Sequence, residues 1–179
     1  VMDPWLIMRE WHEYDQLKRA IWHVEVPIEH GELIEVAHGL NLEVGLAINP
    51  KTPIKEIFPF INPTNIRISN LRSAESRISR YELRDTSFVD EVLVMGVIPG
   101  KSGQKFMPTT LKTIRALRRK FPKLNIGEDG GLSLKNAHGI IKAGANRLNA
   151  AGAIFLANDP SVAYHELQRL PRSVALRSQ

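Results

Sequence analysis

The sequence predicts an α/β fold in which parallel strands alternate with helices. Two observations lead to this prediction. Short segments rich in Val, Leu and Ile recur along the chain, and almost every one of them is followed by a stretch with the apolar spacing of a helix. Continuous apolar strands joined by helices are typical of a parallel sheet covered by helices, which is either doubly wound or closed as a barrel.

The first half of the chain contains three such units. Apolar residues are spaced as in a helix over 4–18, and the segment AIWHVEV at 20–26 has strand composition. A helix at 29–39, a strand at 42–48 (LEVGLAI) and a helix at 53–60 follow. The apolar run DEVLVMGV predicts the third strand at 90–97.

The second half continues the alternation without a break. We expect a helix at 108–120, a strand at 124–127, a helix at 133–143, a strand at 147–151 and a last helix at 159–169. Five strands in all are therefore predicted, within one domain that covers residues 1–179.

Residues 62–88 interrupt this alternation. They contain five serines and five arginines and have no convincing period, where a connection of a few residues is normal. We interpret them as an insertion that forms a flexible surface loop, and a short amphipathic helix or a segment that docks a partner is the alternative.

Polar and glycine-rich pieces follow three of the predicted strands: Asn49 to Thr52, Pro99 to Gln104, and Glu128 to Gly131. In parallel α/β folds the chemistry lies at the carboxyl ends of the strands, so these pieces should meet on one rim. Each loop taken alone is equally consistent with a simple turn, but the three together predict a site.

The composition restricts the class of protein. No segment approaches the roughly 18 apolar residues of a membrane helix, and the first residues have no secretory or transit pattern, so we expect a cytoplasmic protein without membrane contact. The chain has no cysteine, which excludes disulfides and thiolate metal ligands. The net charge of +5 is spread along the chain without interleaved aromatic residues, so an anionic small substrate is favoured over nucleic acid.

Several blocks resemble the ribulose-phosphate 3-epimerase family, whose members are (β/α)8 TIM barrels of the pentose phosphate pathway. The blocks are His23-Val24-Glu25, Gly45 to Thr52, Val94-Met95 with Pro99 to Phe106, Asp129-Gly130-Gly131, and Ala143 to Asn146. Outside the insertion, they cover nearly all of the chain in the family's order and spacing. The resemblance places Val1 just after the family's third strand, so the chain is expected to hold only the last five βα units.

The resemblance also implies a site. In the family, a divalent cation (Fe²⁺, Zn²⁺, Mn²⁺ or Co²⁺) is held by two histidines and two aspartates, and only Asp129 corresponds to one of these ligands. Asp129 would also be one of the two carboxylates that move the proton at C3, while His23 and Met95 would line the site. Phosphate would be bound by the backbone N–H groups of glycines, namely Gly100, Gly103, Gly130, Gly131 and Gly152.

Departures from the family and simpler interpretations keep alternatives open. Glu128 stands where the family prefers an apolar residue, and Gly152 where a serine that contacts phosphate is common. Asp129 could instead cap a helix, His23 and Glu25 could be a satisfied core pair, and Met95 could be core. Glu128 is not an obvious second base, because neighbouring strand residues point to opposite faces.

Two functions therefore follow from the resemblance. The first is a ribulose-phosphate 3-epimerase, an isomerase that interconverts D-ribulose 5-phosphate and D-xylulose 5-phosphate, with little or no activity in this chain alone. The alternative is a catalytically dead paralogue that binds a sugar phosphate or a partner subunit. An incomplete barrel would also leave strand edges unpaired, so we expect self-association.

Overall fold

The computed structural model describes residues 10, 17–62, 88–100 and 103–170. Five parallel strands form one sheet: β1 (Arg19–His23), β2 (Glu43–Ile48), β3 (Glu91–Met95), β4 (Asn125–Asp129) and β5 (Arg147–Asn149). Their order in the sheet is their order in the chain. A doubly wound sheet contains a point where the strand order reverses, and this sheet has none, so its topology is that of consecutive units of a barrel.

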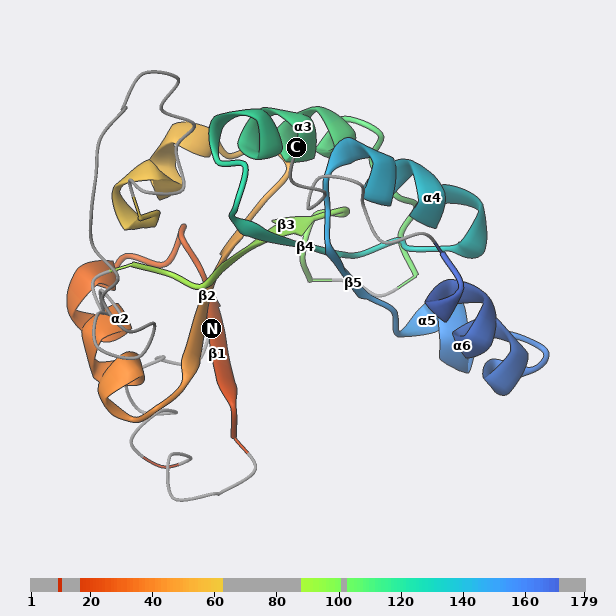
Figure 1. Cartoon of the computed structure of the whole chain (residues 1–179), viewed down its shortest axis with the longest axis horizontal. Coiled ribbons are helices and arrows are strands. Elements are labelled where there is room, and N and C mark those ends of the chain that lie inside the picture. Colours follow the sequence, from red (N-terminus) through yellow and green to blue (C-terminus); the bar gives the residue numbers. More distant parts are fainter. Residues whose placement is uncertain (1–9, 11–16, 63–87, 101–102, 171–179) are drawn as a thin grey trace, which may run out of the picture.

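Helices follow the strands and lie around the sheet (Figure 1). They are α2 (His30–Gly39), the 3₁₀ helix η1 (Ile54–Phe60), α3 (Thr110–Lys120), α4 (Leu134–Ala143), α5 (Gly152–Phe155) and α6 (Pro160–Gln168). In the part of the chain that is described, no helix is both long and apolar enough to cross a membrane.

The two faces of the sheet differ in chemistry. Alternate strand residues such as Val44, Leu46, Val92 and Val94 are fully buried in one large core together with side chains of the helices. The other face, which would be the interior of a barrel, carries a small separate cluster made of Ala47, Leu93 and Met95. This inner face is therefore available for polar groups.

Charged residues occupy the amino-terminal part of the inner face. Glu91 on the central strand is 1% exposed and forms ion pairs with Arg147 on β5 and with Arg19 on β1. Burial raises the pKa of Glu91 more than the two guanidinium groups lower it. The Glu91 carboxyl reaches over β4 at Gly127, where a β-carbon would collide with it. One residue of β3 thus contacts side chains from both edge strands.

The predicted alternation of strands and helices is confirmed, with differences at particular elements. The strand expected at 20–26 ends at His23, and β5 ends at Asn149 rather than at residue 151. The helix expected at 53–60 is a 3₁₀ helix with Pro59 inside it. The short helix α5 was not predicted. Most of the helix expected at 4–18 lies outside the described residues, and Leu17 and Lys18 are not helical.

The predicted insertion at 62–88 lies outside the described residues except for its ends. Those ends meet, because Val89 N donates a hydrogen bond to Phe60 O at 2.9 Å. The chain then joins the sheet at once, since Asp90 N donates a hydrogen bond of 2.9 Å to Val44 O on β2. The segment therefore leaves and rejoins the fold at one place.

Replacing residues 63–87 with a four-residue Gly/Ser linker should leave the fold intact, because the ends already meet. Shortening the connection lowers the entropy cost of closing it, so we expect the free energy of unfolding to rise by about 1 to 2 kcal/mol. Urea unfolding of both forms measures this difference. A large loss of stability would mean that the segment packs against the domain.

Candidate active site

A cavity of about 800 Å³ lies at the carboxyl ends of β3, β4 and β5. Seven of the eight residues named from the sequence line it: Met95, Gly100, Gly103, Asp129, Gly130, Gly131 and Gly152. His23 is the exception and is described below. Residues that lie up to 57 positions apart in the chain, from Met95 to Gly152, were predicted to share one site, and the structure places them around one cavity.

Asp129 is the last residue of β4, so its backbone is fixed on both sides. It pairs with Met95 on β3 and with Asn149 on β5, and its carbonyl accepts a hydrogen bond from Gly96 N at 2.6 Å. The neighbouring strand end is held as well, since the Thr110 hydroxyl donates to Met95 O at 3.1 Å. The carboxyl group is therefore presented from a rigid strand end rather than from a loop, which differs from the expectation that the strand would end at residue 127.

The electrostatics of Asp129 suit a group that exchanges a proton. Burial raises the pKa of Asp129, and the positive charge that His23 can carry lowers it in part. An aspartate with a raised pKa is a better proton acceptor and keeps its proton to a higher pH than an exposed aspartate.

His23 lies at the end of β1, and its ring is held by a neighbouring carboxyl group. Its Nδ1 is 3.2 Å from Glu25 Oε2, and the side chains are 33% and 28% exposed. Glu25 Oε1 accepts a hydrogen bond from Asn49 N at 2.9 Å, in the loop after β2. Burial raises the pKa of Glu25, but hydrogen bonds from Thr52 and Asn49 and the charge of His23 outweigh burial and lower the pKa overall.

The loop after β4 has the backbone geometry that glycine permits. Gly130 and Gly131 have φ angles of 109° and 70°, and a β-carbon at Gly131 would lie 2.6 Å from Phe106 N. Asn136 of α4 donates to Gly131 O at 2.9 Å and accepts from Ser133 N at 2.8 Å, which ties the loop to the start of α4. Backbone N–H groups in such a loop before a helix are suited to an anion.

Gly131→Ala should disrupt this loop, because both the positive φ and the contact with Phe106 oppose a β-carbon. We expect a loss of about 1 to 3 kcal/mol in stability and weaker phosphate binding. Gly139→Ala in α4 is the matched control, since nothing lies within 4 Å of its added carbon, and it should stabilise by up to about 1 kcal/mol. Equal effects of the two changes in thermal unfolding would contradict this account.

Glu128 is the unexpected residue of this region. It was expected in a loop, but it belongs to β4, is fully buried, and neither of its carboxyl oxygens has a hydrogen-bond partner among the described residues. Burial, with a smaller contribution from the charge of Asp129, raises the pKa of Glu128 to about 8. It does not line the cavity that contains Asp129.

The described residues do not fit a divalent metal on their own. Among them, no three His, Asp or Glu side chains gather closely enough to hold a metal ion. Asp129 is half-buried at the cavity and could supply one oxygen ligand. The remaining ligands of a metal site would have to come from outside the described part of the chain.

Further side chains complete the cavity, and of these the sequence did not indicate those of α5. Asn149 lines it one strand away from Asp129, and Gln104 donates from Nε2 to Ile98 O at 2.6 Å within the loop after β3. Phe155 and Leu156, at the end of α5, complete the wall although they are 76% and 83% exposed. Helix α5 is too short to give a periodic signal in the sequence.

Comparison with known proteins agrees with this geometry. The model of the "Ribulose-phosphate 3 epimerase family" matches residues 78–155. The ribulose-phosphate 3-epimerase of Schizosaccharomyces pombe is 39% identical over 139 residues, which are 78% of this chain and 50% of that protein. Over its matched residues, the chain belongs to the ribulose-phosphate 3-epimerase family.

Further relatives extend the match to other kingdoms. The cytoplasmic isoform of ribulose-phosphate 3-epimerase from Oryza sativa is 34% identical, and the match covers 83% of this chain and 56% of that protein. The Methanocaldococcus jannaschii ribulose-phosphate 3-epimerase is 30% identical, with coverages of 88% and 58%. The chain thus spans about half the length of the curated relatives it matches.

A solved structure supports the fold independently. A mutant tryptophan synthase alpha-subunit from Pyrococcus furiosus superposes with a TM-score of 0.50 at 13% identity, over 89% of this chain and 55% of that chain. At this identity the likeness concerns the fold alone, and it agrees with five consecutive βα units of a TIM barrel.

Proposed function

We propose that this chain contributes the phosphate-binding side and one acid–base carboxyl group of a ribulose-phosphate 3-epimerase site. The reaction would interconvert D-ribulose 5-phosphate and D-xylulose 5-phosphate at C3. One observation carries the proposal: the cavity places Asp129 next to the five glycines Gly100, Gly103, Gly130, Gly131 and Gly152. Family membership supports it.

Each group has a role that follows from its chemistry. The backbone N–H groups of the glycine loops would bind the phosphate without a charged side chain, and the start of α4 adds a favourable dipole. Asp129 would take the proton from C3 or return it, and its raised pKa suits both steps. Met95 would pack beside the sugar from β3. The divalent metal of the family, if bound, would stabilise the negative charge that develops on the substrate oxygens.

Titration calorimetry and NMR test the binding part of this proposal. Wild-type chain should bind D-ribulose 5-phosphate with chemical-shift changes localised to residues 129–132 and 149–152, and it should bind D-ribulose without phosphate much more weakly. Binding without turnover would favour the alternative of a catalytically dead paralogue. If neither heat nor localised shifts appeared with the phosphorylated sugar, both the proposed epimerase site and the alternative of a paralogue that binds a sugar phosphate would be contradicted.

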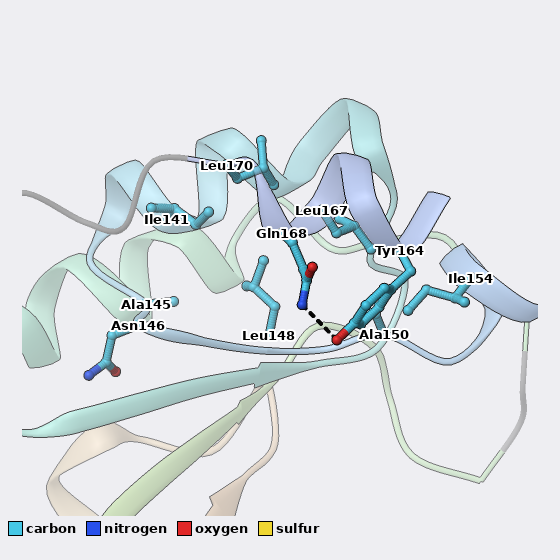
Figure 2. A pocket seen from close by; sticks show the side chains of 10 residues that line it. All are labelled: Ile141, Ala145, Asn146, Leu148, Ala150, Ile154, Tyr164, Leu167, Gln168 and Leu170. Atoms are coloured by element: carbon cyan, nitrogen blue, oxygen red, sulfur yellow. Dashed lines mark hydrogen bonds between the residues drawn. The ribbon is translucent and has the colours of Figure 1, made fainter. Parts of the chain in front are cut away.

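We also propose that the chain self-associates through the β5 side of the sheet. A second cavity of about 780 Å³, lined mostly by apolar residues, lies there between β5, α4 and α6, and on its α6 wall Gln168 donates a hydrogen bond of 2.6 Å to the Tyr164 hydroxyl (Figure 2). The exposed Phe155 and Leu156 lie on the same edge. Sedimentation that showed a monomer across a wide concentration range would contradict this proposal.

A cytoplasmic location is the remaining proposal. It is supported by the relative from Oryza sativa that is named a cytoplasmic isoform. We propose no nucleic-acid or membrane partner, because the phosphate group of the proposed substrate is sufficient to explain an anion-binding site.

A further inference from the structure

We propose that His23, oriented by Glu25, forms a polar subsite that binds the sugar hydroxyl groups at the end of the substrate remote from the phosphate. This inference rests on the proposed function, because it assumes that a sugar phosphate occupies the cavity. It assigns a binding role to a pair that would otherwise be a satisfied, partly buried ion pair.

The strand register places His23 on the correct side of Asp129. On the inner face, His23 pairs with Ala47, Ala47 with Leu93, and Leu93 with Gly127. Ala47 and Leu93 are apolar, so His23 is the polar side chain at the β1 end of this row. The glycine loops that would hold the phosphate follow β3, β4 and β5 at the opposite end. A ligand that extends from those loops past Asp129 therefore points toward β1.

The same row of residues leads from His23 to the reacting region. It reaches β4 at Gly127, two residues before Asp129 and on the same face of that strand. A five-carbon sugar phosphate that contacts the glycine loops and Asp129 would thus have its far hydroxyl groups near the His23 ring.

Glu25 determines which ring nitrogen faces the ligand. A carboxylate only accepts hydrogen bonds, so His23 Nδ1, 3.2 Å from Glu25 Oε2, must carry a proton. Glu25 is itself fixed by the hydrogen bond from Asn49 N and by the Thr52 side chain. Nε2 is left for the ligand, as an acceptor in the neutral ring and a donor in the protonated one, and a sugar hydroxyl matches either state.

A second polar atom beside this pair has no partner. Asn49 Oδ1 is buried and makes no hydrogen bond within the described part of the chain, although the backbone of the same residue binds Glu25. Buried polar atoms are normally paired, so an unpaired amide oxygen on this part of the rim is consistent with a missing polar ligand. By contrast, a purely structural role gives the His23–Glu25 pair little value, since partly exposed ion pairs add little stability.

The experiment compares two probes, D-ribulose 5-phosphate and inorganic phosphate, on the wild-type chain and three variants. His23→Ala should weaken binding of D-ribulose 5-phosphate about 5- to 20-fold, the usual effect of losing one or two hydrogen bonds, and should change inorganic phosphate binding less than about twofold. His23→Gln, which keeps a polar side chain, should lose less. His138→Ala on the exposed side of α4 is the matched histidine control and should change neither affinity.

Glu25→Gln tests the positioning role separately. Long-range ¹H–¹⁵N NMR of the wild-type chain should show the neutral His23 ring protonated at Nδ1, and this preference should weaken in Glu25→Gln together with the affinity for the sugar phosphate. In the wild type, the His23 ring signals should also shift with D-ribulose 5-phosphate and not with inorganic phosphate. This measurement tests the His23 subsite without any variant.

The outcomes separate this inference from the proposed function. If the wild type binds D-ribulose 5-phosphate but the affinity of His23→Ala and the His23 signals do not change, only the His23 subsite is overturned. If the wild type does not bind the sugar phosphate, the proposed function fails and this inference fails with it. Equal losses of affinity for both probes in His23→Ala would also overturn the inference, because they would indicate general disruption.

Discussion

Purified alone, this chain is expected to interconvert D-ribulose 5-phosphate and D-xylulose 5-phosphate at no more than a trace rate. Inversion at C3 requires one group that removes the proton and a second group on the opposite face that returns it. Among the described residues that line the cavity, Asp129 is the one carboxyl group. Each missing acid–base group costs roughly 100- to 10,000-fold in rate, and the described residues hold no metal site to compensate.

Incorporation of solvent deuterium at C3, followed by NMR, measures even slow proton exchange. Any residual exchange should disappear in Asp129→Asn. It should persist in Asp159→Asn, a matched control at the start of α6 whose side chain only accepts a hydrogen bond from Val162 N. Fast exchange that collapsed in both Asp129→Asn and Glu25→Gln would contradict the prediction and would identify Glu25 as a second base.

Glu128→Leu is expected to stabilise the protein at pH 8 by several kcal/mol. The wild-type carboxyl group is fully buried, and its two oxygens have no partner in the described structure. A side chain of similar volume without polar atoms removes this desolvation cost. Urea unfolding at pH 8 gives the difference directly, and an unchanged or lower stability would show that Glu128 has a partner or a use.

The same residue predicts a dependence of stability on pH. Its pKa rises from the ordinary value of 4.5 in the unfolded chain to about 8 in the folded protein. Between these values the folded state binds one more proton, so the free energy of unfolding falls as the pH rises, by at most about 5 kcal/mol in total. This contribution is fully present below pH 4.5, is lost by about pH 8, and should be absent in Glu128→Leu.

Glu91 provides a contrasting control for both measurements. It is as buried as Glu128, but it is paired with Arg147 and Arg19. Glu91→Gln should therefore destabilise, by about 1 to 3 kcal/mol, because two partly buried guanidinium groups lose their counter-charge. Opposite signs for two buried glutamates on neighbouring strands would show that pairing, and not burial alone, decides the effect.

The fold could be predicted from the sequence where the pattern was periodic. Apolar runs followed by helical spacing gave all five strands and most helices, since a parallel sheet buried by helices leaves that pattern. The pattern failed where local chemistry competes with it. Pro59 prevents a regular α-helix in η1, and the four residues of α5 contain barely one turn.

The candidate site was predictable for a different reason. Residues after parallel strands meet on one edge, so Met95, Asp129 and Gly152 could be brought together without any structure. Glu128 could not be placed in this way. Its position next to Asp129 predicted that the two side chains face opposite ways, but the strand was expected to end at residue 127, and only the packing reveals that β4 buries Glu128 completely.

The position of Glu91 affects how the sheet can open. In a sheet whose strands follow chain order, each unit contacts mainly its neighbours, so the two ends would be free to fray separately. The ion pairs of Glu91 instead connect strands that are not neighbours. Arg19 and Arg147 lie on opposite edge strands, 128 positions apart in the chain, and both pair with the carboxyl group of Glu91. Partial unfolding at one edge therefore changes the electrostatic environment at the other, which makes the five strands one cooperative unit.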